Sequence, residues 1–443
     1  MSKNGIPSVS VFRFLSRAGQ ILKNPLPFHH ENFEKLGAIF RVNLGFGKSM
    51  IFSRDAKLAQ YVLQKNHKNY HKSEIQTKEL AKYVGKGLLT SEGDHWKKQR
   101  KLLQPTFHKK QLVQLLTAIQ KAITAELDKI TTNAPIDVFP IFNDLAFQTV
   151  VKSLFSSAAN QKDINRLQYI TESAQRMLVK ELRQPFKKWW FHLSGELARN
   201  KDLTLEARDI LKKLVQDRKE SKERKGDLLD MLLEARYEDG NGMDAEQLID
   251  EILIIFTAGH ETTSNALTFT CELLARHSEV QEKVATEVRS ARAQSTSLME
   301  FIKSCSYTKQ VIEESMRLYP PVYFIDRVNF EEDTFENLVI PKGSNLLFSL
   351  FEIHRSKEFW QEPEKFDPDR FAEGKALQYS AYYYPFGAGP RMCIGNNFAM
   401  YEMILATAEV VEKFKISAKT ENIKIKPLIT LKPEEAFLEF NLR

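Results

Sequence analysis

The feature that most constrains this fold is one long apolar helix candidate. Starting at Met243, it reads MDAEQLIDEILIIFTAGHETTSNALTFTCELLARH. Asp244, with Gln247 three residues later, forms a capping-box signature for a helix start. About 34 residues at about 1.5 Å each span roughly 50 Å, which crosses a whole domain. We therefore expect this helix to be central and buried, with other elements packed around it.

Two residues in the middle of this stretch are unusual for a buried helix. Gly259 weakens a helix interior, and Glu261 places a carboxyl group among apolar residues. The letters HE at His260 and Glu261 resemble half of the zinc motif HExxH, but Ser264 stands where the second histidine is needed. The sequence therefore excludes that zinc site, and ordinary core packing does not explain the glutamate.

The remaining patterns predict a mainly α chain with a smaller β part. Residues 38–53 alternate apolar and polar around a glycine turn, which predicts a β-hairpin. The letters GFGKS there are not a phosphate-binding loop, because Val42 replaces the required first glycine. Residues 55–319 are mostly helical in pattern, and Pro320 and Pro321 end that region. Short strands, an irregular stretch over 357–395, a last helix over about 396–414 and terminal strands follow.

Composition narrows the class of protein. The 443 residues, 42% of them hydrophobic, allow one large core or two to three modest domains. Only three cysteines, with no CxxC pair, argue against a disulfide framework or a cysteine zinc site and favour a reducing compartment. No run of about 18 apolar residues occurs, so we expect no signal peptide, no membrane anchor and a cytoplasmic protein.

The net charge of +7 leaves several interpretations. Most lysines are expected on solvated helix faces, and a docking face for an acidic partner is the more specific alternative. A nucleic-acid binder is disfavoured, because no nucleic-acid motif accompanies the charge. Residues 183–195, RQPFKKWWFHLSG, suggest a proline-broken aromatic loop between helices. We favour a local hydrophobic cluster there over a mobile cover or a patch that touches a membrane.

Cys393 has surroundings that differ from those of Cys271 and Cys305, which are expected to be small buried hydrophobic side chains. Glycines on both sides of Cys393 let the backbone approach something flat and large. The following helix start and Arg391 both stabilise a thiolate. Such a thiolate is either a nucleophile, which needs a base beside it, or a metal ligand. The glycine-lined loop favours a planar cofactor such as haem.

The stretch FGAGPRMCIG resembles the haem-binding loop of the cytochrome P450 family. It supplies the family's residues at the set spacings: Phe386, Gly389, Arg391, Cys393 and Gly395. The resemblance implies that these residues bind haem b and that Cys393 is the ligand of its iron. It also implies the P450 fold, with a long central helix over a haem held by a cysteine loop.

Other family motifs occur in order along the chain. AGHETT resembles the oxygen-activation motif of the central helix, which implies a catalytic pair. Thr262 is then the hydroxyl that bends the helix and bonds near bound dioxygen, and Glu261 is the acid that relays protons from solvent.

EESMR resembles the family's E-x-x-R motif, and FDPDRF resembles the loop that supplies a second arginine. The resemblance implies that Glu314 is shared by the guanidinium groups of Arg317 and Arg370 as a structural lock behind the haem. Asp369 departs from the pattern, since many family members have glutamate there.

WKKQR resembles the helix that binds the haem propionates, with Trp96 and Arg100 facing the haem edge. By family position, Arg327 and Arg391 serve the same purpose, because two buried carboxylates must be neutralised. His354 stands where the family often has a histidine, and we expect it to be structural.

The implied function is a monooxygenase that uses dioxygen, of the soluble bacterial type, hydroxylating a fatty acid-like or other medium-sized organic molecule. Pocket residues are expected in segments 71–95, 256–262 and 319–326 and near Trp189. Tyr323 and Asp326 offer polar contacts, so oxidative O-demethylation of a methylated sugar, with release of formaldehyde, remains the alternative. A haem gas sensor is disfavoured, because it would leave Glu261 and Thr262 without a purpose.

Expected partners follow from the end of the chain. It ends fifty residues after Cys393, which leaves no room for a reductase domain, so residues 1–443 are expected to form a single P450 domain and to act as a monomer. Electrons would come from a separate ferredoxin or flavodoxin with its NAD(P)H reductase. A basic face is expected to receive that partner; it comprises Lys97, Lys98, Lys101, Lys109 and Lys110.

Overall fold

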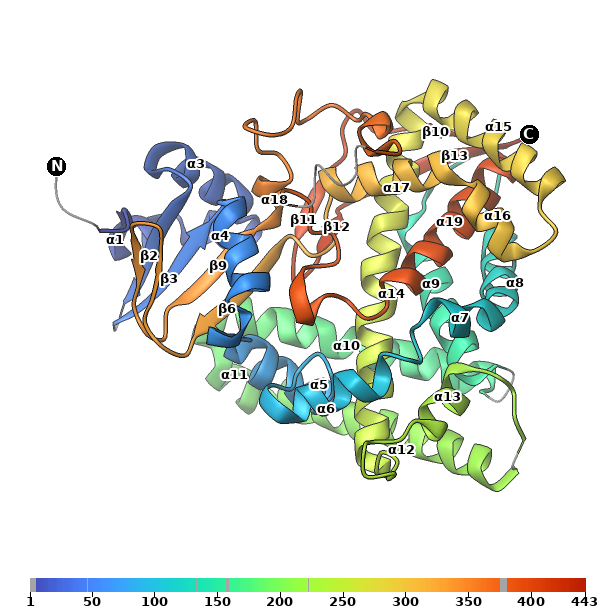
Figure 1. Ribbon diagram of the computed structural model, residues 1–443, viewed down its shortest axis with the longest axis horizontal. Helices are drawn as coiled ribbons and strands as arrows, with labels where there is room; N and C mark the ends of the chain where they lie inside the picture. The colour runs from blue at the N-terminus through green and yellow to red at the C-terminus, as the bar shows by residue number, and fades with distance from the viewer. Residues whose placement is uncertain (1–4, 46, 133, 157–158, 222, 375–380) are drawn as a thin grey trace. The chain divides into compact units, whose positions relative to one another are not determined.

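The computed structural model describes residues 5–45, 47–132, 134–156, 159–221, 223–374 and 381–443. The chain folds into two compact units. One, the sheet unit, comprises Met1–Ser73, Gln310–Cys393 and Lys424–Glu434, and the other, the helical unit, comprises Glu74–Lys309, Ile394–Ile423 and Glu435–Arg443. Figure 1 shows the elements of both units along the chain.

The sheet unit is built on a six-stranded mixed sheet with strand order β1-β2-β3-β9-β6-β4. Strand β3 pairs parallel with β9, and the other central pairs are antiparallel. Two short hairpins, β7–β8 and β11–β12, belong to the same unit. The strands of this unit are β1 (Ser8–Val9), β2 (Ile39–Gly45), β3 (Lys48–Ser53), β4 (Tyr70–His71), β6 (Phe324–Asn329), β7 (Asp333–Phe335), β8 (Leu338–Ile340), β9 (Asn345–Ser349), β11 (Ile425–Pro427) and β12 (Leu431–Pro433).

The helices of the sheet unit are short. They are α1 (Val11–Ser16), α2 (Ala18–Lys23), α3 (Leu26–Leu36), α4 (Ala56–Gln60), η1 (Tyr61–Lys65), η2 (His67–Asn69), α18 (Leu350–Ile353), η6 (Pro368–Phe371) and η8 (Gly389–Arg391). Helix α17 (Ser306–Leu318) runs from the helical unit into the sheet unit.

The hairpin predicted for residues 38–53 is confirmed as β2 and β3. Phe40 and Val42 point into the core while their neighbours are half-buried, as the alternating pattern requires. Gly45 and Gly47 both have positive φ, which suits the turn between the strands.

The helical unit contains α14 (Ala245–Arg276), which packs mainly on α9 (Phe139–Phe155). The predicted start of α14 is confirmed, because the Asp244 side chain accepts a hydrogen bond from Gln247 N at 2.8 Å. The reciprocal bond of a capping box is absent there. Gln247 Nε2 instead donates to Lys86 O and Glu251 Oε1, at 3.1 and 2.9 Å.

Gly259 has a packing explanation. A Cβ at this position would lie 3.0 Å from Val150 Cγ2 on α9, closer than ordinary side chains pack. The glycine therefore lets α9 and α14 approach closely at the middle of α14.

The other elements of the helical unit surround this pair. They are η3 (Ile75–Leu80), α5 (Ala81–Val84), α6 (Gly93–Leu103), α7 (Lys109–Leu112), η4 (Val113–Leu115), α8 (Leu116–Leu127), α10 (Gln161–Arg183), η5 (Pro185–Lys187), α11 (Lys188–Leu193), α12 (Glu196–Ser221), α13 (Leu228–Glu234), α15 (Ser278–Gln294), α16 (Leu298–Ser304) and α19 (Asn396–Lys413), with a three-stranded sheet β10-β13-β5 (Phe414–Ala418, Phe437–Leu442 and Pro135–Asp137). The last helix thus ends within one residue of its predicted limit. No helix of the described ranges has the length and apolar character needed to cross a bilayer.

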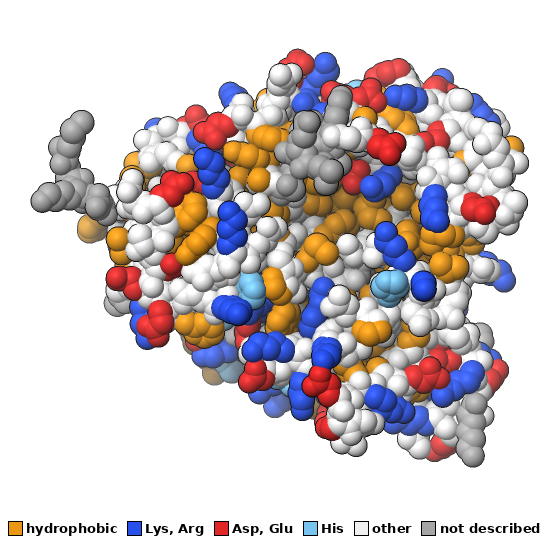
Figure 2. Space-filling model, viewed as in Figure 1, with side chains coloured by type: hydrophobic (Ala, Val, Ile, Leu, Met, Phe, Trp, Pro, Cys, Tyr) orange, Lys and Arg blue, Asp and Glu red, His pale blue; other side chains and the backbone are white. Residues whose placement is uncertain are grey.

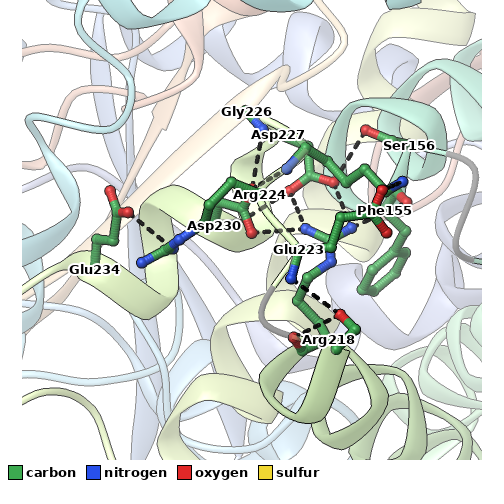
Figure 3. Close-up of polar contacts among 11 residues, drawn as sticks. Phe155, Ser156, Arg218, Glu223, Arg224, Gly226, Asp227, Asp230 and Glu234 are labelled. Atoms are coloured by element: carbon green, nitrogen blue, oxygen red, sulfur yellow. Dashed lines mark hydrogen bonds and ion pairs between the residues drawn. The ribbon is translucent and has the colours of Figure 1, made fainter.

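A buried ion cluster joins the ends of three helices of this unit (Figure 3). Arg218 near the end of α12 forms two bonds with Asp227, both 2.8 Å, and one with Asp230 at 2.7 Å. Asp227 also caps α13 and accepts a bond from Ser156, directly after α9, at 3.0 Å. Because charge-assisted bonds satisfy these buried groups, the cluster fixes the α12–α13 connection against α9.

The loop predicted for residues 183–195 is wrong, because the segment is helical, as η5 and α11. The hydrophobic cluster expected there is only partly buried. Of its large apolar side chains Phe191 is buried, whereas Trp189 and Trp190 are exposed.

Candidate functional site

The loop that carries Cys393 is closed by short backbone hydrogen bonds within the sheet unit. Cys393 N donates to Phe386 O at 2.9 Å, which brings the two ends of the loop together. Inside the loop, Gly387 N donates to Tyr384 O at 3.1 Å and Met392 N donates to Gly389 O at 3.0 Å. The structure therefore brings Phe386, Gly389, Arg391 and Cys393 together on one tight turn.

Glycine is required at position 389 in this turn. Gly389 has a φ of 69°, and a Cβ there would lie 2.0 Å from Leu63 O of η1. No side chain fits such a distance to a backbone atom. Gly387 also has positive φ, but its added Cβ would meet only Ile325 Cδ1 at 3.6 Å, an ordinary contact. Positive φ thus favours glycine at both positions, and at position 389 a side chain is also excluded by the contact with Leu63 O.

The three cysteines differ as expected. Cys271 and Cys305 are buried, and burial raises the pKa of both thiols, that of Cys305 to about 12. Cys393 is exposed. An added Cβ at Gly395 would meet nothing within 4 Å. An exposed thiol on a loop that contains glycines fits the iron and face of a planar haem.

The Glu314–Arg317 pair is fully buried in the sheet unit. Arg317 Nε and Nη2 donate to the two oxygens of Glu314, at 2.7 and 2.8 Å. Burial raises the pKa of Glu314, and the Arg317 guanidinium opposes that effect. Arg370 contributes less than predicted, because its Nε lies 3.4 Å from Glu314 Oε1 as an ion pair while its Nη2 donates to Glu362 O. The lock is therefore one arginine fork plus a weaker second cation.

Arg317 also holds the irregular stretch that follows β9. Its Nη1 and Nη2 donate to the carbonyl oxygens of His354, Pro363 and Lys365, at 2.9, 2.7 and 3.1 Å. In the same stretch, Asp367 N donates to Glu314 Oε1 at 2.9 Å. The Arg317 and Glu314 side chains thus supply hydrogen-bond partners to backbone groups that helix or strand hydrogen bonds would otherwise satisfy. Residues 375–380 of the predicted irregular stretch lie outside the described residues.

His354 has the structural role that was expected. It is fully buried, and its Nε2 accepts a hydrogen bond from Tyr384 N at 2.9 Å. Burial lowers its pKa to about 3, so the imidazole is neutral at pH 7. It anchors the backbone just before the cysteine loop.

Two further predicted haem-binding residues lie in the sheet unit. Arg327 is buried on β6, and its Nη1 donates to Asp326 O at 2.6 Å. Arg391 is half-buried. The pKa of His67 is lowered first by the burial of His67 and second by the positive charge of Arg391. Contact of these two arginines with haem carboxylates stays a prediction.

The predicted catalytic residues lie on α14 in the helical unit. Most of α14 is buried, yet Ala258 is exposed and Thr262, one turn later, is half-buried. The Thr262 hydroxyl donates to Ala258 O at 2.8 Å, so its oxygen keeps lone pairs that can accept a hydrogen bond. A small-residue opening in the middle of a buried helix fits a cofactor face rather than core packing.

Glu261 lies on the buried side of this opening, with 7% of its surface exposed. The neighbouring His260 is fully buried, and its Nδ1 lies 2.6 Å from Phe256 O. Glu261 is thus buried and the next residue, Thr262, is half-buried, and the catalytic role of the two residues stays a prediction.

Trp96 and Arg100 lie one turn apart on α6 of the helical unit, with Trp96 buried and Arg100 half-buried. The i, i+4 spacing puts both side chains on one face of α6. Their role toward haem carboxylates stays a prediction.

The sequence reasoning missed how residues 85–88 are tied to α14. Lys86 N donates to Asp250 at 2.7 Å and Leu88 N donates to Glu251 at 3.0 Å. A Cβ at Gly85 would lie 2.0 Å from Asp250 Oδ1. The G-x-G spacing at 85–87 signals a close backbone approach, but it does not tell which helix is approached.

One of the polar groups expected near a substrate already has a hydrogen-bond partner within the protein. The Tyr323 hydroxyl donates to Leu428 O at 2.6 Å, so its hydrogen is not available to a bound molecule. Asp326 is buried on β6, and Trp189 is exposed on α11.

The lysines of the proposed basic face are partly paired. Lys97 lies 2.9 Å from Asp94, Lys101 pairs with Glu238, and Lys98 lies over the Tyr237 ring. Figure 2 shows Lys and Arg interspersed with Asp and Glu over the face that it draws. Lys109 and Lys110 begin α7.

Comparison with known proteins gives consistent matches. The family model described as cytochrome P450 matches residues 7–440. Echinocystic acid 23-monooxygenase of Saponaria officinalis is 31% identical over 386 residues, 81% of this chain and 74% of that protein. Cyclooctat-9-en-7-ol 5-monooxygenase of Streptomyces melanosporofaciens is 26% identical over 382 residues, 86% of this chain and 83% of that protein.

A solved structure also matches over the full length. The retinoic acid-bound cyanobacterial CYP120A1 has a TM-score of 0.85 and 22% identity, and the match covers 100% of both chains. These relatives come from plants as well as bacteria, so assignment to the soluble bacterial type stays a prediction. The P450 fold that was expected is confirmed.

Proteins of this family bind haem b through a cysteine thiolate, and the exposed thiol of Cys393 on its glycine turn fits that ligand. The relatives compared above are monooxygenases, so the chain is an oxidoreductase of that kind. The family model spans nearly all of the sequence, and one relative exceeds 30% identity over most of both proteins. The chain therefore belongs to the cytochrome P450 family.

Proposed function

We propose that this P450 hydroxylates a medium-sized, largely apolar organic molecule such as a fatty acid. The observation that carries the proposal is the opening at Ala258 and Thr262 on α14, with Glu261 buried beside it. The same side of α14 offers the half-buried Ile255, three residues before Ala258, as an apolar side chain. Binding of such a molecule is driven by burial of apolar surface.

In this proposal each site residue has one role. Cys393 holds the haem iron, and the haem, when bound, supplies the dioxygen activation and C–H oxidation. Arg327, Arg391, Trp96 and Arg100 bind the propionate edge. Phe386, Gly389 and Gly395 shape the loop.

Thr262 and Glu261 transfer protons to the reaction site. The Thr262 hydroxyl donates to Ala258 O, so its oxygen accepts a hydrogen bond from a proton donor in the pocket. Glu261 is buried next to it and passes protons inward without admitting bulk water. Both roles depend on the small, exposed Ala258, which leaves space beside the helix.

Oxidative O-demethylation of a small methylated sugar is the second candidate. It requires polar side chains that bind sugar hydroxyl groups. Asp326 is one, but the Tyr323 hydroxyl already donates to Leu428 O, which makes this pocket less suited to a sugar.

The remaining parts of the proposal concern the whole protein. Both units act as one P450 domain over residues 1–443, in a cytoplasmic monomer. A separate ferredoxin or flavodoxin, reduced by its NAD(P)H reductase, delivers electrons to the face that carries Lys97, Lys98, Lys101, Lys109 and Lys110. The exposed Lys109 and Lys110 at the start of α7 support an electrostatic approach of an acidic partner.

The haem-thiolate role is tested first, by the spectrum of the ferrous protein with carbon monoxide. We expect a strongly red-shifted Soret band that Cys393→Ala abolishes, whereas Cys271→Ala retains it. The band surviving in Cys393→Ala would overturn the assignment of the iron ligand.

The substrate class is tested by titrating the ferric protein with fatty acids and with methylated sugars. We expect fatty acids to shift the Soret band and to give hydroxylated products. A shift with methylated sugars only, together with formaldehyde release on turnover, would favour the second candidate.

A further inference from the structure

The carboxylate of Asp333, at the start of β7, holds the segment that follows α4 in the sheet unit. Its Oδ1 accepts a hydrogen bond from the Tyr61 hydroxyl at 3.0 Å. Its Oδ2 accepts bonds from Asn66 Nδ2 at 2.9 Å and from the Tyr70 hydroxyl at 2.7 Å. These donors stand at the two ends of η1 and at the start of β4, so one carboxylate ties residues 61–70 to β7 at three points. Hydrogen bonds to a carboxylate are stronger than bonds between neutral groups.

The segment held in this way contains a π-helical turn. In η1, Asn66 N donates to Tyr61 O at 2.8 Å, a bond to the fifth preceding residue rather than to the fourth, as in an α-helix. Such a turn is rare and often marks a functional site. The Tyr61 ring packs on the Phe335 ring with centroids 5.1 Å apart, and Tyr70 is fully buried. The turn therefore has packing contacts as well as the Asp333 bonds to hold it in one position.

The inner side of η1 lies against the loop that carries Cys393. Leu63 O approaches Gly389 so closely that a Cβ at this glycine would lie 2.0 Å from the oxygen. Val62 and Leu63 also belong to the same buried hydrophobic cluster as Tyr384 and Ala388 of the loop. Since interiors are close-packed, a shift of η1 is transmitted to the loop.

The residues after η1 approach the loop nearer to its cysteine. Met392 N donates to Gly389 O at 3.0 Å, so Gly389 closes the turn that leads directly into Cys393. The positive charge of Arg391 in this turn acts on His67 in η2, whose pKa is lowered first by burial and second by that charge. Residues 61–67 thus touch the turn through a backbone contact and reach it through a charge.

We propose that Asp333 is a positioning residue for the thiolate ligand of the haem iron. Through its bonds to η1, Asp333 holds Leu63 O against Gly389, and the glycine turn then fixes the orientation of Cys393. Residues that orient a metal ligand tune the metal without touching it. The strength of the sulfur–iron bond therefore depends on a carboxylate of another segment. The proposal rests on the role of Cys393 proposed above and is independent of the substrate.

Two measurements on the haem-loaded protein test the proposal: the carbon monoxide spectrum of the ferrous state, and amide exchange. Asp333→Asn keeps the size of the side chain but replaces one acceptor oxygen by an NH2 group. During incubation at constant temperature, we expect this variant to lose the red-shifted Soret band roughly fivefold faster than the wild type. Amide exchange should become faster in residues 61–66 and 387–393 and stay unchanged in β9.

Two conservative variants keep the test decisive if Asp333→Asn fails to fold. Tyr61→Phe and Tyr70→Phe preserve both rings and remove only the hydroxyl groups that donate to Asp333. Each should accelerate loss of the red-shifted band by less than Asp333→Asn does, and the double variant should approach it.

Glu352→Gln is the matched control, because Glu352 is another buried carboxylate of the sheet unit. Its oxygens lie 3.1 Å from His30 Nδ1 and 3.4 Å from Arg54 Nη1, on α3 and directly after β3 rather than on the cysteine loop. We expect the rate of band loss and the amide exchange of residues 387–393 to equal those of the wild type.

The proposal is wrong if Asp333→Asn and the double tyrosine variant keep the wild-type rate of band loss. It is also wrong if amide exchange rises equally throughout the sheet unit, or if Glu352→Gln loses the band as fast as Asp333→Asn. In both cases Asp333 would only stabilise the fold. A wild-type protein without the red-shifted band would instead remove Cys393 as the iron ligand, and this proposal with it.

Discussion

At the scale of single residues, the cysteine loop depends on one backbone contact. Gly389→Ala would combine a positive φ with a Cβ 2.0 Å from Leu63 O, whereas Gly387→Ala would meet only an ordinary contact. We expect Gly387→Ala to cost about 1–2 kcal/mol of stability from the left-handed backbone. Gly389→Ala should cost more and should reduce haem content, measured as the ratio of Soret to protein absorbance. Equal losses in both variants would contradict the steric explanation.

Glu402 on α19 is a second residue with a measurable signature. It is completely buried in the helical unit, and burial raises the pKa of its carboxyl well above the usual range, which the nearby Thr149 hydroxyl opposes only in part. The folded protein therefore keeps this proton at pH values where the unfolded chain has released it. The stabilising contribution is complete below the unfolded pKa and is lost as pH rises toward the folded pKa.

We therefore expect Glu402→Gln to remove a pH-dependent loss of stability of about 1.4 kcal/mol per pH unit above about pH 4.5. Thermal unfolding measured across pH tests this. Glu409→Gln on the same helix is the matched control, because Glu409 is paired with Lys413 at 2.9 Å and bonded by Thr124. If wild type and Glu402→Gln show the same pH slope, the buried acid is not protonated as expected.

At the scale of elements, the Arg218 cluster is expected to govern the α12–α13 connection. Arg218→Met would leave Asp227 and Asp230 buried without their cation, which costs about 3–5 kcal/mol. The matched control is Arg166→Met, since Arg166 makes two 2.6 Å bonds to Glu206 on the surface of the same unit. That exposed pair should contribute less than about 1 kcal/mol.

Denaturant or thermal unfolding compares the two variants, and amide exchange over α13 locates the effect. Similar small losses in both would mean that the buried cluster is not required for stability. A loss confined to Arg218→Met, with faster exchange in α13, is the expected result.

At the scale of the whole molecule, the net charge of +7 favours a negatively charged electron donor. We expect reduction by an acidic ferredoxin to slow as ionic strength rises, because a Debye length of about 10 Å at 0.1 M screens exposed lysines. Lys109→Gln with Lys110→Gln should lower the second-order rate several-fold at low salt. Lys342→Gln, an exposed lysine paired with Glu331, is the control. A rate indifferent to salt would contradict a docking role for these lysines.

Local signals predicted much of the fold. The hairpin of β2 and β3 follows from a period of two, and the start of α14 follows from Asp244 and Gln247. E-x-x-R predicted the Glu314–Arg317 pair, because both residues lie on one helix. These features are encoded within a few residues of each other.

Apart from the Glu314–Arg370 ion pair, which the family resemblance implied, contacts between distant segments were not predicted. Nothing near Gly389 in the sequence shows that Leu63 O lies against it, and nothing near Arg317 shows that three carbonyl groups will surround its guanidinium. Segment 186–193 shows a third limit. Its periodicity gives an apolar face, but it does not tell whether that face meets protein or water.

The Arg317 guanidinium has one more consequence. A segment without helix or strand normally fluctuates residue by residue, yet here a single planar cation gathers carbonyl groups from positions 354, 363 and 365. We therefore expect the stretch leading toward Cys393 to move as one block. The stiffness of this stretch then depends on the Arg317 side chain, which lies outside it, and is expected to be lost when that positive charge is removed.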